Sequence, residues 1–175
     1  MEPTNPVATA VIAGLLLTSV AAFPGGRVSA DNFLGAHGHL AISPLTQPSF
    51  VQRTFRAPLT AYGPGHRGID LLATDGEPLV SPIAGNISFN GLVALKPEVT
   101  VASPDGLHFT LEPACGELPA GSHVSQGSPV GVVCASGYQS HCSPEVCLLF
   151  SARNQIGYLS PLWLMGQQSI SHLVS

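Results

Sequence analysis

The sequence predicts a small all-β protein built from antiparallel sheets, and two observations lead to that fold class. The composition is rich in turn formers and poor in charge, with 19 glycines and 16 prolines against six basic and ten acidic residues among 175. Short runs of Val, Ile, Leu and Phe are separated by Gly, Pro, Asn and Asp, and no helical stripe of convincing length follows residue 30. This length suits one domain and a leader, and it is enough chain to bury a core.

Residues 1–30 have the composition of a targeting segment. The stretch 7–23 carries no charge and is rich in Ala, Val, Ile and Leu, and small residues stand near its end and at Ala30, at spacings that a signal peptidase accepts. No Lys or Arg precedes this stretch, and its length is near the lower limit for spanning a bilayer. A cleaved signal peptide, an uncleaved membrane anchor and a buried core helix are therefore open alternatives. We expect export, with the protein secreted or anchored at the cell envelope.

The rest of the chain divides into three parts. A polar, Pro-rich stretch at 31–54 is expected to be a linker or edge segment, the folded domain to span 55–165, and a tail to occupy 166–175. Alternating or continuously apolar runs predict strands at 68–72, 78–83, 86–92, 99–103, 107–112, 129–134 and 146–153.

Three dipeptides are strong turn signals between these strands: Asp75-Gly76, Asn90-Gly91 and Asp105-Gly106. The only helix candidate after the leader is a brief turn at 161–165.

The four cysteines fit two disulfides in an exported chain. Three pairings are possible. A short loop with a proline separates Cys142 from Cys147, which favours a bridge between them and leaves Cys115 to pair with Cys134 at the ends of two apolar segments. A zinc site built from these cysteines is the less favoured alternative, because no Cys-x-x-Cys pair is present.

His66 and Asp70 are the residues that say most about chemistry. In an extended segment, residues two and four apart share a face, so His66, Gly68 and Asp70 line up while Ile69 and Leu71 turn towards a core. An imidazole and a carboxylate that flank a glycine leave room for an ion such as zinc. The alternative without a metal is that Asp70 accepts hydrogen bonds from His66 or from backbone N–H groups and so fixes the turn.

The order of these motifs resembles the lysostaphin-type metallo-endopeptidases, which cut peptidoglycan cross-bridges. The segment 65–71 is followed by Gly-Glu-Pro-Leu-Val-Ser-Pro-Ile-Ala-Gly at 76–85, by Gly-x-x-Val-x-x-Gly-x-x-Val-Gly at 121–131 and by Tyr-x-x-Pro-Leu at 158–162. The resemblance covers roughly 55–165 and is similar to the branch in high-GC Gram-positive bacteria, where Cys-Leu-His-Trp replaces the usual His-x-His. It implies the compact β-sandwich or half-barrel of that family, in one domain.

The resemblance also implies a zinc site, which this sequence has only in part. His66 and Asp70 match two of the family's three zinc ligands, whereas the third position falls on Leu149, which has no lone pair to offer. The catalytic His of the family falls on Cys147, and a further family His falls near Glu112, the only ionisable group there. Since metal-activated hydrolysis needs about three protein ligands and a bound water, zinc is expected to be weakly bound or absent and the chain to be a poor peptidase.

Replacement ligands are conceivable. His108 is the best substitute because it stands on the strand that lines the family's cleft, and His123, His141 or a free Cys147 are the others. His123 and His141 fit exposed turn histidines equally well.

Four aromatic residues and one arginine have candidate roles around the cleft. Tyr62 and Tyr138 are candidates for contacting a peptide, and Arg67 is a candidate for contacting the carboxylate of a stem peptide, the alternative being solvation. Phe150 and Trp163 are expected in the core rather than stacked on a glycan.

The predicted function is that of a non-catalytic cell-envelope module that keeps the peptidase fold. It would bind a peptidoglycan stem peptide or cross-bridge, or regulate a true cell-wall hydrolase. The alternatives are an active zinc endopeptidase with a substituted third ligand and a structural envelope protein without a ligand. The net charge of −4 and the lack of a basic patch argue against nucleic acid.

Overall fold

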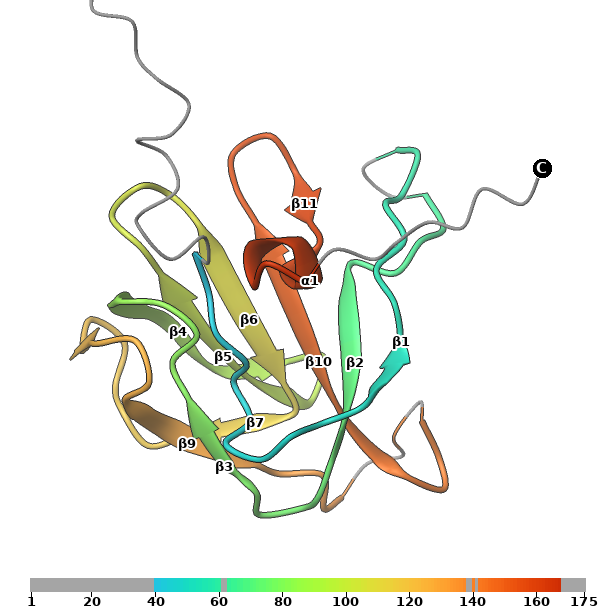
Figure 1. Cartoon of the computed structure of the whole chain (residues 1–175). Helices are drawn as coiled ribbons and strands as arrows, with labels where there is room; N and C mark the ends of the chain where they lie inside the picture. The colour runs from blue at the N-terminus through green and yellow to red at the C-terminus, as the bar shows by residue number, and fades with distance from the viewer. Residues whose placement is uncertain (1–39, 61–62, 138–139, 141, 168–175) are drawn as a thin grey trace, which may run out of the picture.

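The regular secondary structure of this computed structural model, which describes residues 40–60, 63–137, 140 and 142–167, is two antiparallel sheets and one short helix. Within those residues the elements are β1 (Val51–Arg53), β2 (Gly68–Ala73), β3 (Pro78–Val80), β4 (Gly85–Val93), β5 (Lys96–Ala102), β6 (His108–Glu112), β7 (Ala114–Gly116), β8 (His123–Val124), β9 (Pro129–Val133), β10 (Val146–Arg153), β11 (Tyr158–Leu159) and the helix α1 (Pro161–Leu164). The predicted all-β fold class is confirmed (Figure 1).

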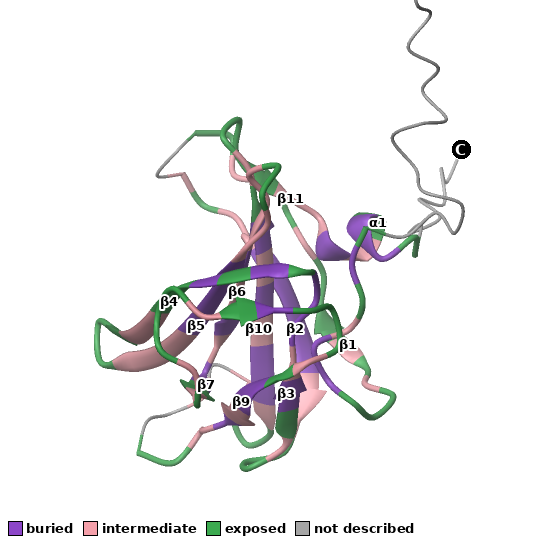
Figure 2. Cartoon of the chain, turned by 90° about the vertical axis from the view of Figure 1, so that its left-hand side faces the viewer, coloured by how far each residue is buried: buried purple, intermediate pink, exposed green. Residues whose placement is uncertain are grey.

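The larger sheet has the strand order β1-β2-β10-β6-β5-β4-β8, with β11 paired to β10. The smaller sheet has the order β3-β9-β7. One core joins the two sheets, as the buried residues in Figure 2 show; it contains Ile69, Leu71, Leu79, Ile87, Val99, Val101, Phe109, Leu111, Ala114, Val130, Val133, Leu148 and Phe150, among others.

Strict alternation along four neighbouring strands explains this core. On β2, β10, β6 and β5, every second side chain is apolar and buried, because successive side chains of a strand point to opposite faces. Phe150 and Phe109 are the largest of them, and their rings stack with centroids 5.4 Å apart. The core positions predicted for Ile69, Leu71 and Phe150 are confirmed, and the remaining residues of these strands form the opposite face, on which the candidate site lies.

The predicted strands are present, with ends shifted by a few residues, and Asp75-Gly76 and Asp105-Gly106 lie in turns. The turn predicted at Asn90-Gly91 is wrong. β4 runs on to Val93 and the chain turns at Ala94 and Leu95, whose φ angles are +47° and +70°. The Asn90 side chain instead serves a tertiary contact, since its Nδ2 donates a hydrogen bond to the Leu118 carbonyl at 2.9 Å.

The segment before Phe55 joins the domain from Leu40 onward. Ala41 and Leu45 are buried, and β1 is the edge strand of the larger sheet. Trp163 on α1 is 61% exposed, so its predicted core position is wrong. Pro161 begins this single-turn helix, and Leu164 rather than Trp163 faces the core.

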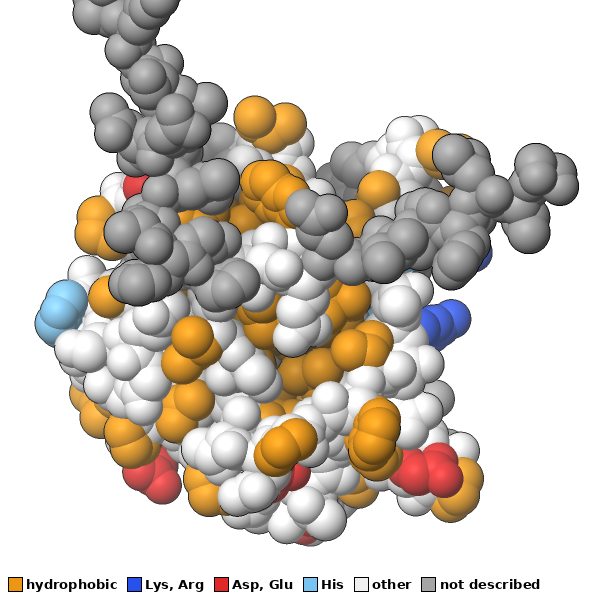
Figure 3. Space-filling view, viewed as in Figure 1, with side chains coloured by type: hydrophobic (Ala, Val, Ile, Leu, Met, Phe, Trp, Pro, Cys, Tyr) orange, Lys and Arg blue, Asp and Glu red, His pale blue; other side chains and the backbone are white. Residues whose placement is uncertain are grey.

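The surface reflects the weakly charged composition. On the face shown in Figure 3, charged side chains are few and lie among uncharged polar and hydrophobic ones. No helix in the described part of the chain is long and apolar enough to span a membrane. The predicted leader and residues 168–175 of the predicted C-terminal tail lie outside the described residues.

Candidate functional site

The outer face of the larger sheet brings the sequence-predicted site residues into one row. Strand register places Asp70 of β2 opposite Leu149 of β10, and Leu149 opposite Glu112 of β6. Directly opposite residues of an antiparallel pair point to the same face, with Cβ atoms about 5 Å apart. The three positions that the sequence singles out, Asp70, Leu149 and Glu112, are therefore neighbours across three strands.

His66 and Asp70 are held against each other at the start of β2. His66 Nε2 lies 3.1 Å from Asp70 Oδ1, the Asp70 side chain is fully buried, and that of His66 is 12% exposed. The backbone of His66 is fixed by two hydrogen bonds with Arg56, and His66 Nδ1 donates to the Thr54 carbonyl at 2.9 Å. Because a carbonyl only accepts, Nδ1 carries a proton, and Nε2 is the ring atom that faces the carboxylate. Metal-binding histidines are oriented in the same way: one ring nitrogen donates to a backbone carbonyl, and the other faces the metal.

Leu149 lies opposite Asp70 and occupies the space above Gly68. A Cβ atom at position 68 would lie 2.9 Å from Leu149 Cδ1 and 2.5 Å from the Phe150 carbonyl oxygen. The room that Gly68 leaves is therefore filled by an apolar methyl group and by the backbone of β10. His66 and Asp70 supply only two ligands here, and zinc sites in proteins take about three or more, so this part of the site does not fit the family's zinc ion.

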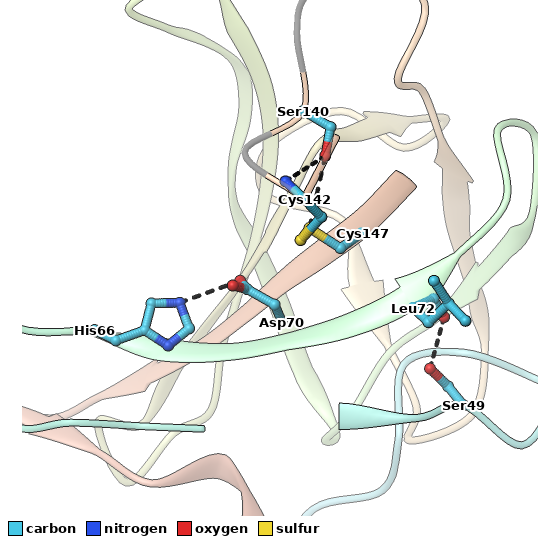
Figure 4. Close-up of a disulfide and its surroundings, with 7 residues drawn as sticks. All are labelled: Ser49, His66, Asp70, Leu72, Ser140, Cys142 and Cys147. Atoms are coloured by element: carbon cyan, nitrogen blue, oxygen red, sulfur yellow. Dashed lines mark hydrogen bonds and ion pairs between the residues drawn. A yellow bond between two sulfur atoms is a disulfide. The ribbon is translucent and has the colours of Figure 1, made fainter. Parts of the chain in front are cut away.

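Cys147 stands on the same face as Leu149, two residues before it, and forms a disulfide with Cys142. The second disulfide joins Cys115 to Cys134, so both predicted pairings are confirmed. Figure 4 shows the Asp70 carboxylate between the His66 ring and the Cys142–Cys147 bridge. A sulfur atom in a disulfide has no thiolate charge, and Cys147 is not a catalytic acid or base in this form.

Glu112 is tied to the only lysine of the chain. Lys96 Nζ donates a hydrogen bond to Glu112 Oε1 at 2.6 Å. Next to this ion pair lies Glu98, whose pKa is raised to about 7 by burial, then by hydrogen bonding with and repulsion from Glu112, against the smaller opposing effect of Lys96. The sequence analysis did not single out Glu98. Its position directly before the predicted strand at 99–103 is the signal that could have placed it beside Glu112.

Glu98, Glu112 and Leu149 line one end of a groove of about 520 Å³ over the outer face. Basic and aromatic residues line its other end: the Arg67 guanidinium lies 5.6 Å from the centre of the Tyr158 ring, and Arg153 lies opposite Tyr158 in the pairing of β10 with β11. Glu112 lies opposite Leu149 on β10, and Arg153 is four positions further along β10. The two ends of the groove are therefore about 13 Å apart. The groove is acidic at one end and basic at the other.

The remaining histidine candidates lie elsewhere. His108 is opposite Arg153 at the basic end, about four residues along the sheet from Asp70 and Leu149, and it is not brought to them. Burial, and then the charge of Arg153, lower the pKa of His108. His123 is exposed on β8 at the far edge of the sheet, 3.2 Å from Asn86. His141, Tyr62 and Tyr138 lie outside the described residues.

No protein-family model matches the sequence. Proteins of Mycobacterium bovis and Mycobacterium tuberculosis that are described as uncharacterized are 33% identical over 126 residues, which is 70% of this chain and 50% of theirs. The chain thus spans about half the length of the curated relatives it matches.

Solved structures show which fold this is. The catalytic domain of lysostaphin from Staphylococcus simulans matches with a TM-score of 0.57 at 16% identity, over 67% of this chain and 92% of that one. The catalytic domain of the prophage-encoded M23 protein EnpA from Enterococcus faecalis matches with a TM-score of 0.53 at 21% identity, over 66% and 90%. A chain of the SpoIIQ–SpoIIIAH pore-forming complex matches with a TM-score of 0.56 at 16% identity, over 74% and 92%. The described domain has the fold of lysostaphin-type M23 peptidases.

Proposed function

We propose that this chain is a non-catalytic cell-envelope module that binds a peptide of peptidoglycan, a stem peptide or a cross-bridge, in the groove over its outer face. The observation that carries the proposal is Leu149. Opposite Asp70, it fills the room that Gly68 leaves with a methyl group, while the groove beside it stays open and charged. The chain thus has a fold that occurs in peptidases and an open groove, but Leu149 stands where the third metal ligand would be.

The charges of the groove suit a short extended peptide. Glu98, beside the Glu112–Lys96 ion pair, is the group at one end that an amine would meet, and an amine there favours the charged form of Glu98. Arg67 and Arg153 at the other end attract a carboxylate. The span of about 13 Å between the two ends corresponds to about four residues of extended chain. Tyr158 beside Arg67 adds a flat apolar surface for the peptide between them.

Binding and cleavage can be measured on the same samples. Purified oxidised protein is sedimented with insoluble peptidoglycan, and soluble muropeptides are titrated by calorimetry, with and without a chelator. We expect binding that the chelator does not change, and no new amino groups by mass spectrometry after incubation with zinc.

Arg153→Glu reverses the charge at the basic end of the groove. It should weaken binding about tenfold, because the new carboxylate repels the carboxylate of the peptide. Arg56→Glu, at an exposed position outside the groove, makes the same change in net charge and should bind like the wild type. Equal binding by both variants would refute the groove as the binding site. Cleavage that the chelator stops would support the alternative, an active zinc endopeptidase.

A further inference from the structure

We propose that the Cys142–Cys147 disulfide covers a zinc site that opens on reduction, with His66, Asp70, Cys142 and Cys147 as its four ligands. A carboxylate oxygen of Asp70 and the two sulfur atoms all lie within 4.8 Å of one another. His66 Nε2 lies 3.1 Å from the Asp70 carboxylate but outside the group of atoms within 4.8 Å of one another, so its ring must turn towards the sulfur atoms to complete the site. These residues come from two separate stretches of the chain, 66–70 and 142–147, and meet beside β2 and β10 (Figure 4).

The spacing suits a tetrahedral ion once the sulfur atoms are released from each other. Zinc binds sulfur at about 2.3 Å and nitrogen or oxygen at about 2.0–2.2 Å, so neighbouring ligand atoms of a tetrahedral site lie about 3.3–3.8 Å apart. The ligand atoms of Asp70, Cys142 and Cys147 need shifts of only about 1 Å to reach this geometry. A set of one nitrogen, one oxygen and two sulfur ligands is within the range that zinc accepts.

Two of the four ligands, Asp70 and Cys147, are preorganised. Asp70 and Cys147 are buried on paired strands, where Cys147 stands opposite Leu72, two residues from Asp70. The backbone of His66 is fixed by its hydrogen bonds with Arg56, and Nδ1 bonds to the Thr54 carbonyl, so Nε2 is the ring atom that faces Asp70. Cys142 is half-buried in the loop before β10, so it is both the adaptable ligand and the sulfur that a reductant can reach.

A dithiol reductant can open the bridge by thiol–disulfide exchange. One of its thiolates attacks Cys142 Sγ and forms a mixed disulfide, while Cys147 leaves as a thiolate. The second thiol of the reductant then displaces Cys142, so two electrons and two protons pass to the protein and the reductant becomes a disulfide. Zinc binding displaces the protons of the two protein thiols.

Charge favours a cation in the reduced form. Two thiolates beside the buried carboxylate of Asp70 would place three negative groups within 4.8 Å of one another, an arrangement that a divalent ion neutralises and that is otherwise unfavourable. In the oxidised form only Asp70 carries this charge, and the site has no thiolate ligand. The bridge is thus the element that decides whether the ion binds, and Leu149 need not take part.

The test uses the full exported chain with Cys115 and Cys134 both changed to Ala, so that reduction opens one bridge only. The protein is treated with a phosphine reductant, freed from it without oxygen, and titrated with zinc against a chromophoric chelator, and with cobalt in a parallel sample. We expect one equivalent of zinc and a thiolate-to-cobalt charge-transfer band in the reduced protein, and well under one equivalent and no band in the oxidised protein. Circular dichroism follows the fold throughout.

Asp70→Asn and His66→Gln in the same background distinguish zinc binding at the proposed site from zinc binding by the two reduced cysteines alone. Each should weaken zinc binding at least tenfold, because each removes a ligand, and Cys142→Ala should abolish the cobalt band. Glu117→Gln, an exposed change away from the site, serves as the control. The proposal is overturned if the folded, reduced protein takes up no zinc, or if its affinity is the same in the Asp70→Asn and His66→Gln variants.

Discussion

Glu98 and Glu112 face each other on neighbouring strands, and this pair makes the stability of the fold depend on pH. The pKa of Glu98 is raised to about 7, by burial first and then by Glu112. Its ordinary value is 4.5, so between pH about 4.5 and 7 the folded state holds a proton that the unfolded state has released. The free energy of unfolding therefore falls as pH rises through this window, and the loss is complete above pH about 7.

We expect this loss to be about 1 kcal/mol, well below the full value of the shift, because Glu98 is only half-buried and water screens it. Glu98→Gln should remove the slope, which denaturant unfolding at a series of pH values measures. Glu117→Gln makes the same chemical change at an exposed site and should keep it. An unchanged slope in Glu98→Gln would show that another group titrates in this window.

The β4–β5 turn offers a stabilising substitution. Leu95 has φ +70° and is 85% exposed, so it adopts a left-handed conformation without burying its side chain. That conformation costs about 1–2 kcal/mol for a residue with a Cβ atom, whereas glycine adopts it freely but loses more entropy on folding. Leu95→Gly should raise the free energy of unfolding by about 0.5–1 kcal/mol.

The same change at Leu92, an exposed residue of β4, should lower the free energy of unfolding by about 1 kcal/mol, because glycine weakens a strand. Denaturant unfolding of both variants checks the pair. Destabilisation by Leu95→Gly would contradict the left-handed geometry of the turn.

The turn also shows where sequence reasoning succeeded and where it did not. Longer strands can be predicted from the alternation of apolar and polar residues, and both ends of β10 were predicted correctly. Asn90-Gly91 is a strong hairpin signal, yet a tertiary bond to Leu118 keeps Asn90 within β4. Strands of two or three residues, such as β7 (Ala114–Gly116) and β8 (His123–Val124), are too short for any period to be read.

The sequence predicted which residues belong to the candidate site, but not how they are arranged in space. The motif around His66 and Asp70 is local in sequence, and so is the loop between Cys142 and Cys147. That this disulfide lies beside Asp70 depends on the register of β2 with β10, which no local pattern states. Trp163 was expected in the core because of its size, but the single turn of α1 has only one buried side and Leu164 occupies it.

The two disulfides should differ in their contribution to stability. Cys115 and Cys134 are 19 positions apart, and Cys142 and Cys147 only five. In the chain-entropy model the longer loop contributes about 3 kcal/mol and the shorter about 2 kcal/mol. Replacing both members of each pair by Ala should therefore lower the free energy of unfolding more for the first pair than for the second. Denaturant unfolding of the oxidised proteins measures this, and the reverse order would mean that the Cys142–Cys147 bridge holds more structure than its short loop.

Leu149→His tests whether the site has lost a single ligand from an intact arrangement. Leu149 lies opposite Asp70 and over Gly68, so a histidine there would place its ring beside the His66 and Asp70 side chains. Because Leu149 is half-buried, a polar ring should cost about 1 kcal/mol in the absence of metal. Zinc at a hundredfold excess over its dissociation constant would add about 2.7 kcal/mol.

The oxidised Leu149→His protein should therefore melt several degrees higher with zinc than with chelator, and the oxidised wild type should not change. Leu149→Gln, which is polar but brings no imidazole, is the matched control and should behave like the wild type. Hydrolysis is not expected to return, because Cys147 remains in its disulfide. A melting point of Leu149→His that zinc leaves unchanged would mean that the three side chains do not converge, and the assignment of Leu149 to the missing ligand position would be wrong.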